Sequence, residues 1–144
     1  MSDETKPAEP VKSTPASGTI LLVDDDKFLL DMYAMKFARE GFTVKSCLST
    51  DEAITELHQG GAPDVILFDI TMPERDGFSF LEAIAKDASA SSSIKIALTN
   101  QSSDSERTRA QQFGVDDYFV KATMIPSEVV NKVREILASR HPRA

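Results

Sequence analysis

Residues 65–77 read VILFDITMPERDG, a run of four apolar residues that ends in an aspartate and continues into residues that favour turns. The apolar run has no polar face, which is typical of a β-strand covered on both sides. Asp69 stands at its carboxyl end, where a carboxylate is costly unless it is paired, bound to a metal or used in chemistry. The rest of the chain has to show which of these applies to Asp69.

Similar apolar runs recur along the chain and alternate with segments that have helical spacing or helix-capping signals. Strands are expected at 19–23, 42–48, 64–70, 93–99 and 117–121. Helices are expected at 27–41, 49–61, 78–87, 103–114 and 126–140. Two of these helices begin with a capping-box pattern, in which a serine precedes a glutamate by three residues: Ser49 with Glu52, and Ser103 with Glu106.

Connections of this length between successive strands force parallel pairing, with right-handed crossovers. We therefore predict a single α/β domain over residues 19–140, a doubly wound (βα)5 fold with one five-stranded parallel sheet and helices on both faces. Residues 1–18 hold three of the seven prolines and few apolar residues. They are expected to form a flexible N-terminal tail or a linker, and residues 141–144 a short C-terminal tail.

The bulk composition excludes several classes of protein. The 144 residues carry a formal net charge of −7, which argues against a nucleic-acid-binding surface. Cys47 is the single cysteine, so an intrachain disulfide is impossible and a reducing cytoplasm is the expected location. No apolar run approaches the roughly 18 residues of a membrane span. We expect a cytoplasmic domain that does not insert into membranes.

The predicted strand ends share a chemical pattern. In open parallel sheets, ligands bind outside the carboxyl ends of the strands. These ends carry Asp24, Asp25 and Asp26 after the first strand, Asp69 after the third, Thr99 after the fourth and Lys121 after the fifth. Asp26 alone would be read as a helix N-cap. Taken together, neighbouring carboxylates repel one another unless a cation offsets them, and carboxylate oxygens are what Mg²⁺ prefers. The pattern predicts a hard-cation site beside a lysine.

Four stretches, LLVDDD, VILFDITMPERDG, IALT and YFVK, resemble the receiver domain of two-component response regulators, the CheY-like family. They occur in the order of that family and at the expected strand ends, and the resemblance covers about residues 19–140. It implies a flavodoxin-like fold with the strand order 2-1-3-4-5.

The resemblance also implies a role for each strand-end residue. Asp69 would be the phosphoacceptor, which takes a phosphoryl group from a sensor histidine kinase or a phosphotransfer protein. Lys121 would pair with one phosphoryl oxygen, and the hydroxyl of Thr99 would hydrogen-bond another. The implied ligands of Mg²⁺ are Asp24, Asp25, Asp69 and the backbone carbonyl of Thr71.

A switch follows from the same resemblance. Movement of Thr99 toward a phosphoryl group would vacate space that Tyr118, on the last strand, fills. The face that binds a downstream protein target would comprise the helix 103–113, the strand 117–121 and the C-terminal helix. Such a domain is a phosphoacceptor switch that acts only on its own phosphoryl group, and no DNA-binding motif is recognisable in the sequence.

Two positions depart from the family pattern. Ala122 follows Lys121 where the family usually has a proline after a cis peptide, and because a cis bond costs about 2.5–4 kcal/mol without proline, we predict a trans bond. Asn100 stands where a small residue is usual. These departures leave open a binding-only receiver that no longer accepts phosphate. A further alternative is a haloacid-dehalogenase-type phosphatase, but that class has an aspartate at the position of Thr71.

Overall fold

The computed structural model describes residues 18–70, 77–86, 90, 92–100 and 103–140. Its strands are β2 (Thr19–Val23), β3 (Thr43–Cys47), β4 (Val65–Asp69), β5 (Ile94–Thr99) and β6 (Asp117–Val120). Its helices are α1 (Lys27–Arg39), α2 (Thr50–Gly60), α3 (Gly77–Ala85), α4 (Asp104–Gln112), the 3₁₀ turn η3 (Lys121–Thr123) and α5 (Pro126–Arg140). The predicted alternation of strands and helices is confirmed.

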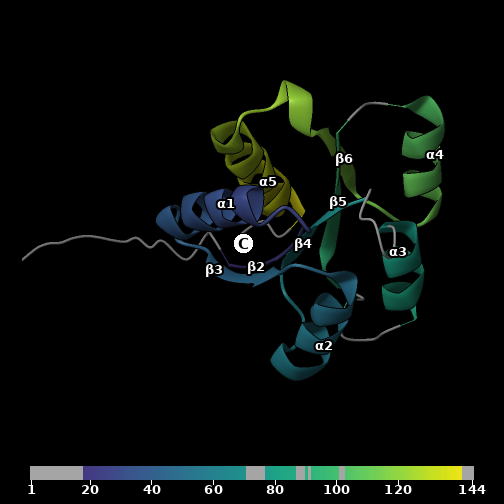
Figure 1. Cartoon of the computed structure of the whole chain (residues 1–144), viewed down its shortest axis with the longest axis horizontal. Coiled ribbons are helices and arrows are strands. Elements are labelled where there is room, and N and C mark those ends of the chain that lie inside the picture. Colours follow the sequence, from purple (N-terminus) through teal and green to yellow (C-terminus); the bar gives the residue numbers. More distant parts are fainter. Residues whose placement is uncertain (1–17, 71–76, 87–89, 91, 101–102, 141–144) are drawn as a thin grey trace, which may run out of the picture.

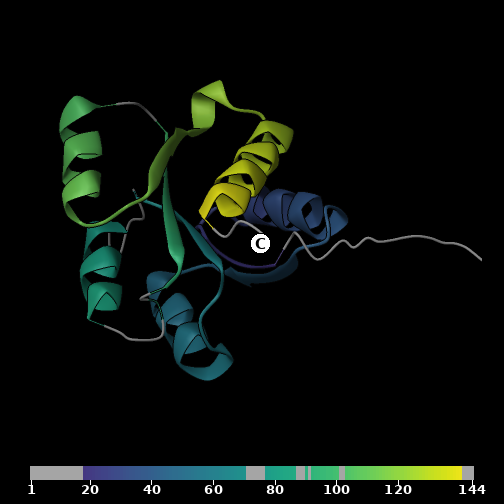
Figure 2. The ribbon, with the colours of Figure 1, turned by 180° about the vertical axis from the view of Figure 1, so that it is seen from behind.

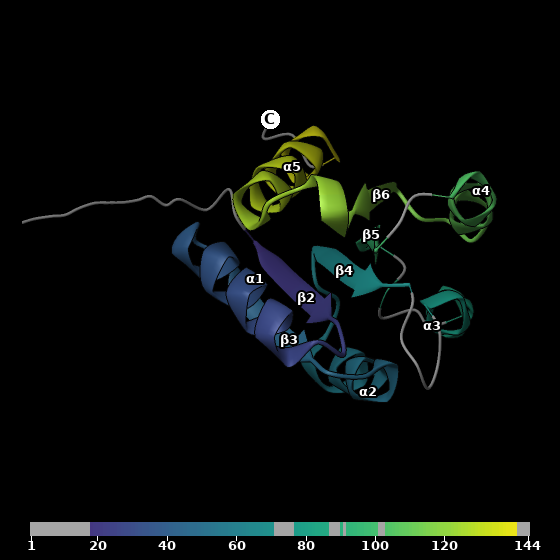
Figure 3. The ribbon, with the colours of Figure 1, turned by 45° about the horizontal axis from the view of Figure 1, so that its top comes forward.

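All neighbouring strands pair in parallel, and their order across the sheet is β3-β2-β4-β5-β6. Numbered by position along the chain, this is the order 2-1-3-4-5 that the resemblance implies. Helices α1 and α5 lie side by side on one face, and α2, α3 and α4 lie on the other (Figures 1 and 3). Figure 2 shows the same two layers from behind. The doubly wound α/β fold is therefore confirmed.

The sheet separates two apolar cores, because successive side chains of a strand point to opposite faces. In β4, Ile66 and Phe68 belong to the core under α2, α3 and α4, whereas Val65 and Leu67 belong to the core under α1 and α5. Every residue of β4 is buried. This explains why the strand reads as an uninterrupted apolar run up to Asp69.

The element boundaries differ slightly from the prediction. Strand β6 ends at Val120, one residue earlier than expected, because Lys121 opens the turn η3. Helix α3 ends at Ala85, short of the predicted residue 87. Helices α1 and α4 stop just before Gly41 (φ +93°) and Gly114 (φ +89°), glycines with the left-handed backbone that ends helices.

The described residues contain no cis peptide bond, so the predicted trans bond between Lys121 and Ala122 is confirmed. Asp26 is the N-cap of α1, and its side chain accepts a hydrogen bond from the backbone N–H of Leu29 at 3.1 Å. Within the described ranges, no helix has the length and apolar character that crossing a bilayer requires.

Candidate functional site

The parallel sheet brings four of the predicted residues to one edge. Asp24 follows β2, Asp69 ends β4, Thr99 ends β5 and Lys121 follows β6. The strand register aligns these ends, because Val23 lies beside Phe68 and Thr99 lies beside Val120. The backbone N–H of Asp24 extends the pairing by one more bond, to the carbonyl of Cys47 at 3.1 Å.

Lys121 joins the two buried carboxylates of this edge. Its Nζ donates to Oδ2 of Asp24 at 2.8 Å and to Oδ2 of Asp69 at 3.0 Å. The side chains are 12% exposed for Lys121, 2% for Asp24 and 4% for Asp69. Two carboxylates therefore share one ammonium group at a place largely shielded from water, where electrostatic interactions are strong.

Burial and hydrogen bonding act in opposite directions on these groups. Burial raises the pKa of Asp24, and the hydrogen bonds from Lys121 and from the backbone N–H of Asp26, at 3.0 Å, offset only part of the rise. Burial lowers the pKa of Lys121, but the hydrogen bond to Asp24 and the charges of Asp69 and Asp24 outweigh it, so the pKa lies above its usual value. Lys121 therefore stays protonated at neutral pH.

A third carboxylate completes an acidic cluster. Asp24, Asp25 and Asp69 present oxygen atoms that lie within 4.8 Å of one another, with Asp25 on the exposed side of the group. When all three are ionised, Lys121 balances one of three negative charges. Such oxygen ligands and excess charge fit a hard divalent cation. The fourth predicted ligand, the carbonyl of Thr71, lies outside the described residues.

The two predicted switch residues also lie together. Thr99 is 2% exposed and Tyr118 is 7% exposed, so both are buried. Burial raises the pKa of Tyr118, as does its hydroxyl's hydrogen bond to Oε1 of Glu106, while hydrogen bonding with the Thr99 side chain and with the backbone of Ser103 lowers it. The aromatic residue on the last strand is thus in contact with the strand-end threonine.

Sequence reasoning missed two residues of this region. Glu106 accepts the hydrogen bond of Tyr118, and the guanidinium carbon of Arg107 lies 4.5 Å from the centroid of the Tyr118 ring. The sequence pattern assigns Glu106 to a capping box, and Arg107 has no signal at all. Only the placement of α4 beside β6 reveals that both residues contact Tyr118.

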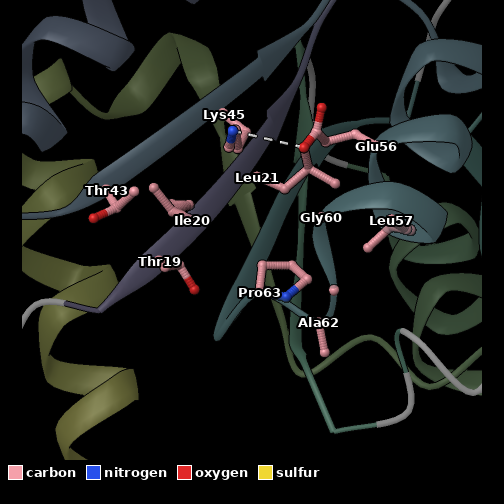
Figure 4. A pocket seen from close by; sticks show the side chains of 11 residues that line it. Thr19, Ile20, Leu21, Thr43, Lys45, Glu56, Leu57, Gly60, Ala62 and Pro63 are labelled. Carbon is pink, nitrogen blue, oxygen red and sulfur yellow. Dashed lines mark ion pairs between the residues drawn. The ribbon is translucent and has the colours of Figure 1, made fainter.

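A small pocket lies away from this site, at the amino ends of the strands. It has a volume of about 90 Å³ and is lined among others by Thr19, Leu57 and Pro63, with the Lys45–Glu56 ion pair (3.8 Å) at its side (Figure 4). Ligand pockets usually measure roughly 300–1,000 Å³. This pocket is small for a ligand site, and none of the predicted strand-end residues lines it.

Comparisons with known proteins place the chain in a family. Residues 20–134 match the sequence model of the response regulator receiver domain. The transcriptional regulatory protein CpxR of Escherichia coli is 31% identical over 122 residues, which cover 85% of this chain and 50% of the relative. The probable transcriptional regulator ycf27 of Guillardia theta is 30% identical over 118 residues, covering 82% and 44%.

Among solved structures, a CheY-like receiver domain protein from Methanospirillum hungatei is similar, with a TM-score of 0.76 and 27% identity over 85% of this chain and 94% of that one. By contrast, the chain spans about half the length of the curated relatives it matches. The similarity to those longer proteins therefore concerns their receiver region.

Proposed function

The chain belongs to the response regulator receiver family, and we propose that Asp69 is its phosphoacceptor. Receiver domains of this family act as phosphoacceptor switches, not as enzymes that turn over other substrates, and they interact with histidine kinases or phosphotransfer proteins and with downstream targets. Membership of this family also removes the haloacid-dehalogenase alternative. The donor of the phosphoryl group is proposed to be the phosphohistidine of such a kinase or phosphotransfer protein.

The observation that carries the proposal is the sharing of Lys121 between the carboxylates of Asp24 and Asp69. In the transfer, an oxygen of Asp69 attacks the phosphorus atom and forms an O–P bond. The N–P bond of the phosphohistidine breaks, and the imidazole leaves with the electron pair. Phosphoryl transfer needs mainly an aligned nucleophile and positive charge near the phosphoryl oxygens, and Lys121 supplies part of that charge.

The acidic cluster supports Mg²⁺ as the proposed cofactor, held by Asp24, Asp25 and Asp69, with the carbonyl of Thr71 as a further proposed ligand. When bound, Mg²⁺ would neutralise charge on the phosphoryl oxygens. The hydroxyl of Thr99 is proposed to donate to a phosphoryl oxygen. Tyr118, in contact with Thr99, is proposed to carry the change to the surface.

Two large exposed apolar side chains stand close in sequence to the residues of the site. Phe28, 77% exposed, lies in the first turn of α1, just after Asp24 to Asp26. Ile125, 61% exposed, precedes α5 and lies four residues after Lys121. We propose that the phosphoryl donor contacts this rim, in the cytoplasm, and that a downstream target binds α4, β6 and α5.

The test is the intact mass of the protein after incubation with acetyl phosphate, with and without Mg²⁺. We expect one phosphoryl adduct in the wild type with Mg²⁺ and none in Asp69→Asn. The matched control is Asp26→Asn, because asparagine also caps helices and Asp26 is not a proposed ligand. That variant should form the adduct. A folded wild type that forms no adduct, and that also gives no spectral change with beryllofluoride, would instead be a binding-only receiver.

A further inference from the structure

Three helices of this chain carry a glutamate near the start of the helix, but these glutamates do not act alike. In α2, Oε1 of Glu52 accepts from the backbone N–H of Leu48 at 3.0 Å. In α5, Oε1 of Glu128 accepts from the backbone N–H of Ile125 at 2.9 Å. Both glutamates thus satisfy a backbone N–H group at the start of their own helix, as in a capping box.

The carboxylate of Glu106 in α4 has a different partner, although Glu106, like Glu52, follows a capping serine by three residues. The hydroxyl of Ser103 still caps the helix, since it accepts from the backbone N–H of Glu106 at 3.3 Å. The carboxylate of Glu106, however, accepts from the hydroxyl of Tyr118, which lies on β6. The glutamates of α2 and α5 thus stabilise their own helices, whereas Glu106 binds a side chain of the sheet.

A second contact from the same helix acts on the same ring. The guanidinium of Arg107 lies over the face of Tyr118, 4.5 Å from the ring centroid, within the range of a cation–π interaction. Glu106 and Arg107 are both partly buried, so water screens these contacts incompletely. Helix α4 therefore holds the hydroxyl and the ring face of Tyr118 through two adjacent residues, beside β6 (Figure 1).

We propose that Glu106 and Arg107 are positioning residues: their side chains hold Tyr118 buried next to Thr99 and thereby set how tightly the acidic site binds a phosphoryl group. The proposal rests on the proposed function, in which the hydroxyl of Thr99 turns to a phosphoryl oxygen. When that happens, the buried hydroxyl of Tyr118 loses its contact with Thr99, and a buried hydroxyl without a partner is costly. Its O–H still donates to Glu106, and the charge of that carboxylate makes the hydrogen bond stronger than a neutral one.

The first measurement asks whether Glu106 positions Tyr118, and it needs no phosphoryl donor. The chain contains two tyrosines and no tryptophan, so ring-¹³C tyrosine labelling gives an NMR spectrum with signals from Tyr33 and Tyr118 only. A soluble paramagnetic agent then reports how exposed each ring is. We expect the Tyr118 signal to shift and its exposure to increase in Glu106→Ala, less in Glu106→Gln, which keeps an acceptor oxygen, and also in Arg107→Met.

The matched control is Glu52→Gln, which alters the equivalent glutamate of α2. It should leave the Tyr118 signal unchanged, and Tyr33 should stay constant in every variant. A Tyr118 signal that is unaffected in folded Glu106→Ala, or that moves equally in Glu52→Gln, would overturn the positioning role.

The second measurement asks whether the position of Tyr118 is coupled to the site. Beryllofluoride, which mimics a bound phosphoryl group, is titrated with Mg²⁺ present. We expect roughly 5–30-fold weaker binding in Glu106→Ala, the lower part of the usual range of such coupling, a smaller loss in Glu106→Gln and none in Glu52→Gln. Removing a negative charge would by itself strengthen binding of an anion, so the expected sign separates positioning from simple electrostatics.

Equal affinity in Glu106→Ala and wild type, with Tyr118 released, would overturn the coupling. Absence of beryllofluoride binding by the wild type itself would contradict the proposed function, and the coupling with it, while the positioning role is still decided by the first measurement.

Discussion

Strand β4 is flanked by two aspartates whose surroundings differ sharply. Asp64 precedes the strand and is partly exposed, and its Oδ2 accepts from the backbone N–H and the hydroxyl of Thr19 at 2.8 and 3.2 Å. Asp69 ends the strand, is buried and shares the ammonium of Lys121 with Asp24. Neutral donors stabilise the carboxylate of Asp64, whereas the buried carboxylate of Asp69 depends on the positive charge of Lys121.

The comparison shows that the role of a strand-end aspartate depends on what the fold brings to it. Asp64 ties the start of β4 to the start of β2, which is a structural task. Asp69 lies among two further carboxylates and a lysine from distant parts of the chain, an arrangement that is unfavourable for stability alone.

The largest expected effect follows from removing the shared cation. Lys121→Met leaves two buried carboxylates without their ammonium group and should lower the free energy of unfolding by about 3 kcal/mol, the usual cost of breaking a buried pair. Denaturant unfolding at pH 7 measures it. Lys45→Met, which breaks the exposed pair with Glu56, should change the free energy by at most about 0.5 kcal/mol. Equal effects of the two substitutions would mean that solvent screens the ion pairs of Lys121 as strongly as it screens the Lys45–Glu56 pair.

A divalent cation should relieve the same repulsion. Mg²⁺ at about 100 times its dissociation constant should stabilise the wild type by about 2.7 kcal/mol, because the proposed site exists only in the folded chain. Thermal unfolding with and without Mg²⁺ measures the shift. Asp25→Asn removes a proposed ligand at the exposed side of the cluster and should lose most of the shift, whereas Asp64→Asn should keep all of it. A full shift in Asp25→Asn would place the cation elsewhere.

Removing the carboxylate of Asp64 should lower the stability of the domain but leave its phosphorylation unchanged. Asp64→Ala loses the two hydrogen bonds to Thr19 and should destabilise the domain by about 1–2 kcal/mol. Its phosphorylation by acetyl phosphate should equal that of the wild type, measured as adduct mass against time. Loss of the adduct in a folded Asp64→Ala protein would contradict a purely structural role of Asp64.

The smallest expected effect concerns pH. The pKa of Asp24 is raised above its usual value of 3.8 by burial, so the folded state holds this proton more tightly than the unfolded chain does. The stabilisation from that proton is present below pH 3.8 and is lost as the pH rises through the raised pKa. Asp24→Asn should therefore gain stability relative to wild type as the pH increases from 3.8 to 7 without Mg²⁺. If the stability of Asp24→Asn relative to wild type instead falls over this pH range, the pKa of Asp24 is not raised in the folded state.

The fold followed from features that act locally or along one strand. The apolar runs of β2 and β4 have no polar face, which required a sheet covered on both sides, and the helix lengths between them required parallel pairing. The parallel arrangement in turn placed Asp24, Asp69, Thr99 and Lys121 at one edge. These residues were therefore predictable from the sequence, with the family resemblance adding their roles.

What the sequence did not reveal depends on side-chain direction across elements. Glu106 has the same spacing from a capping serine as Glu52, yet its carboxylate reaches Tyr118, because α4 packs next to β6. The end of β6 was placed one residue too late, since the apolar pattern YFV does not show that Lys121 starts a turn. The packing of α4 against β6 determines the partner of Glu106, and local backbone geometry determines where β6 ends.

The central claim is that Asp69, and no other carboxylate of the cluster, takes the phosphoryl group. Borohydride reduces an aspartyl phosphate to homoserine, so treatment of the phosphorylated full chain followed by peptide mass spectrometry locates the modified residue directly. Our account predicts homoserine at position 69 in the Mg²⁺-dependent product, with Asp24, Asp25 and Asp64 unchanged. Homoserine at any of those three positions, or a phosphoryl adduct with position 69 intact, would contradict it.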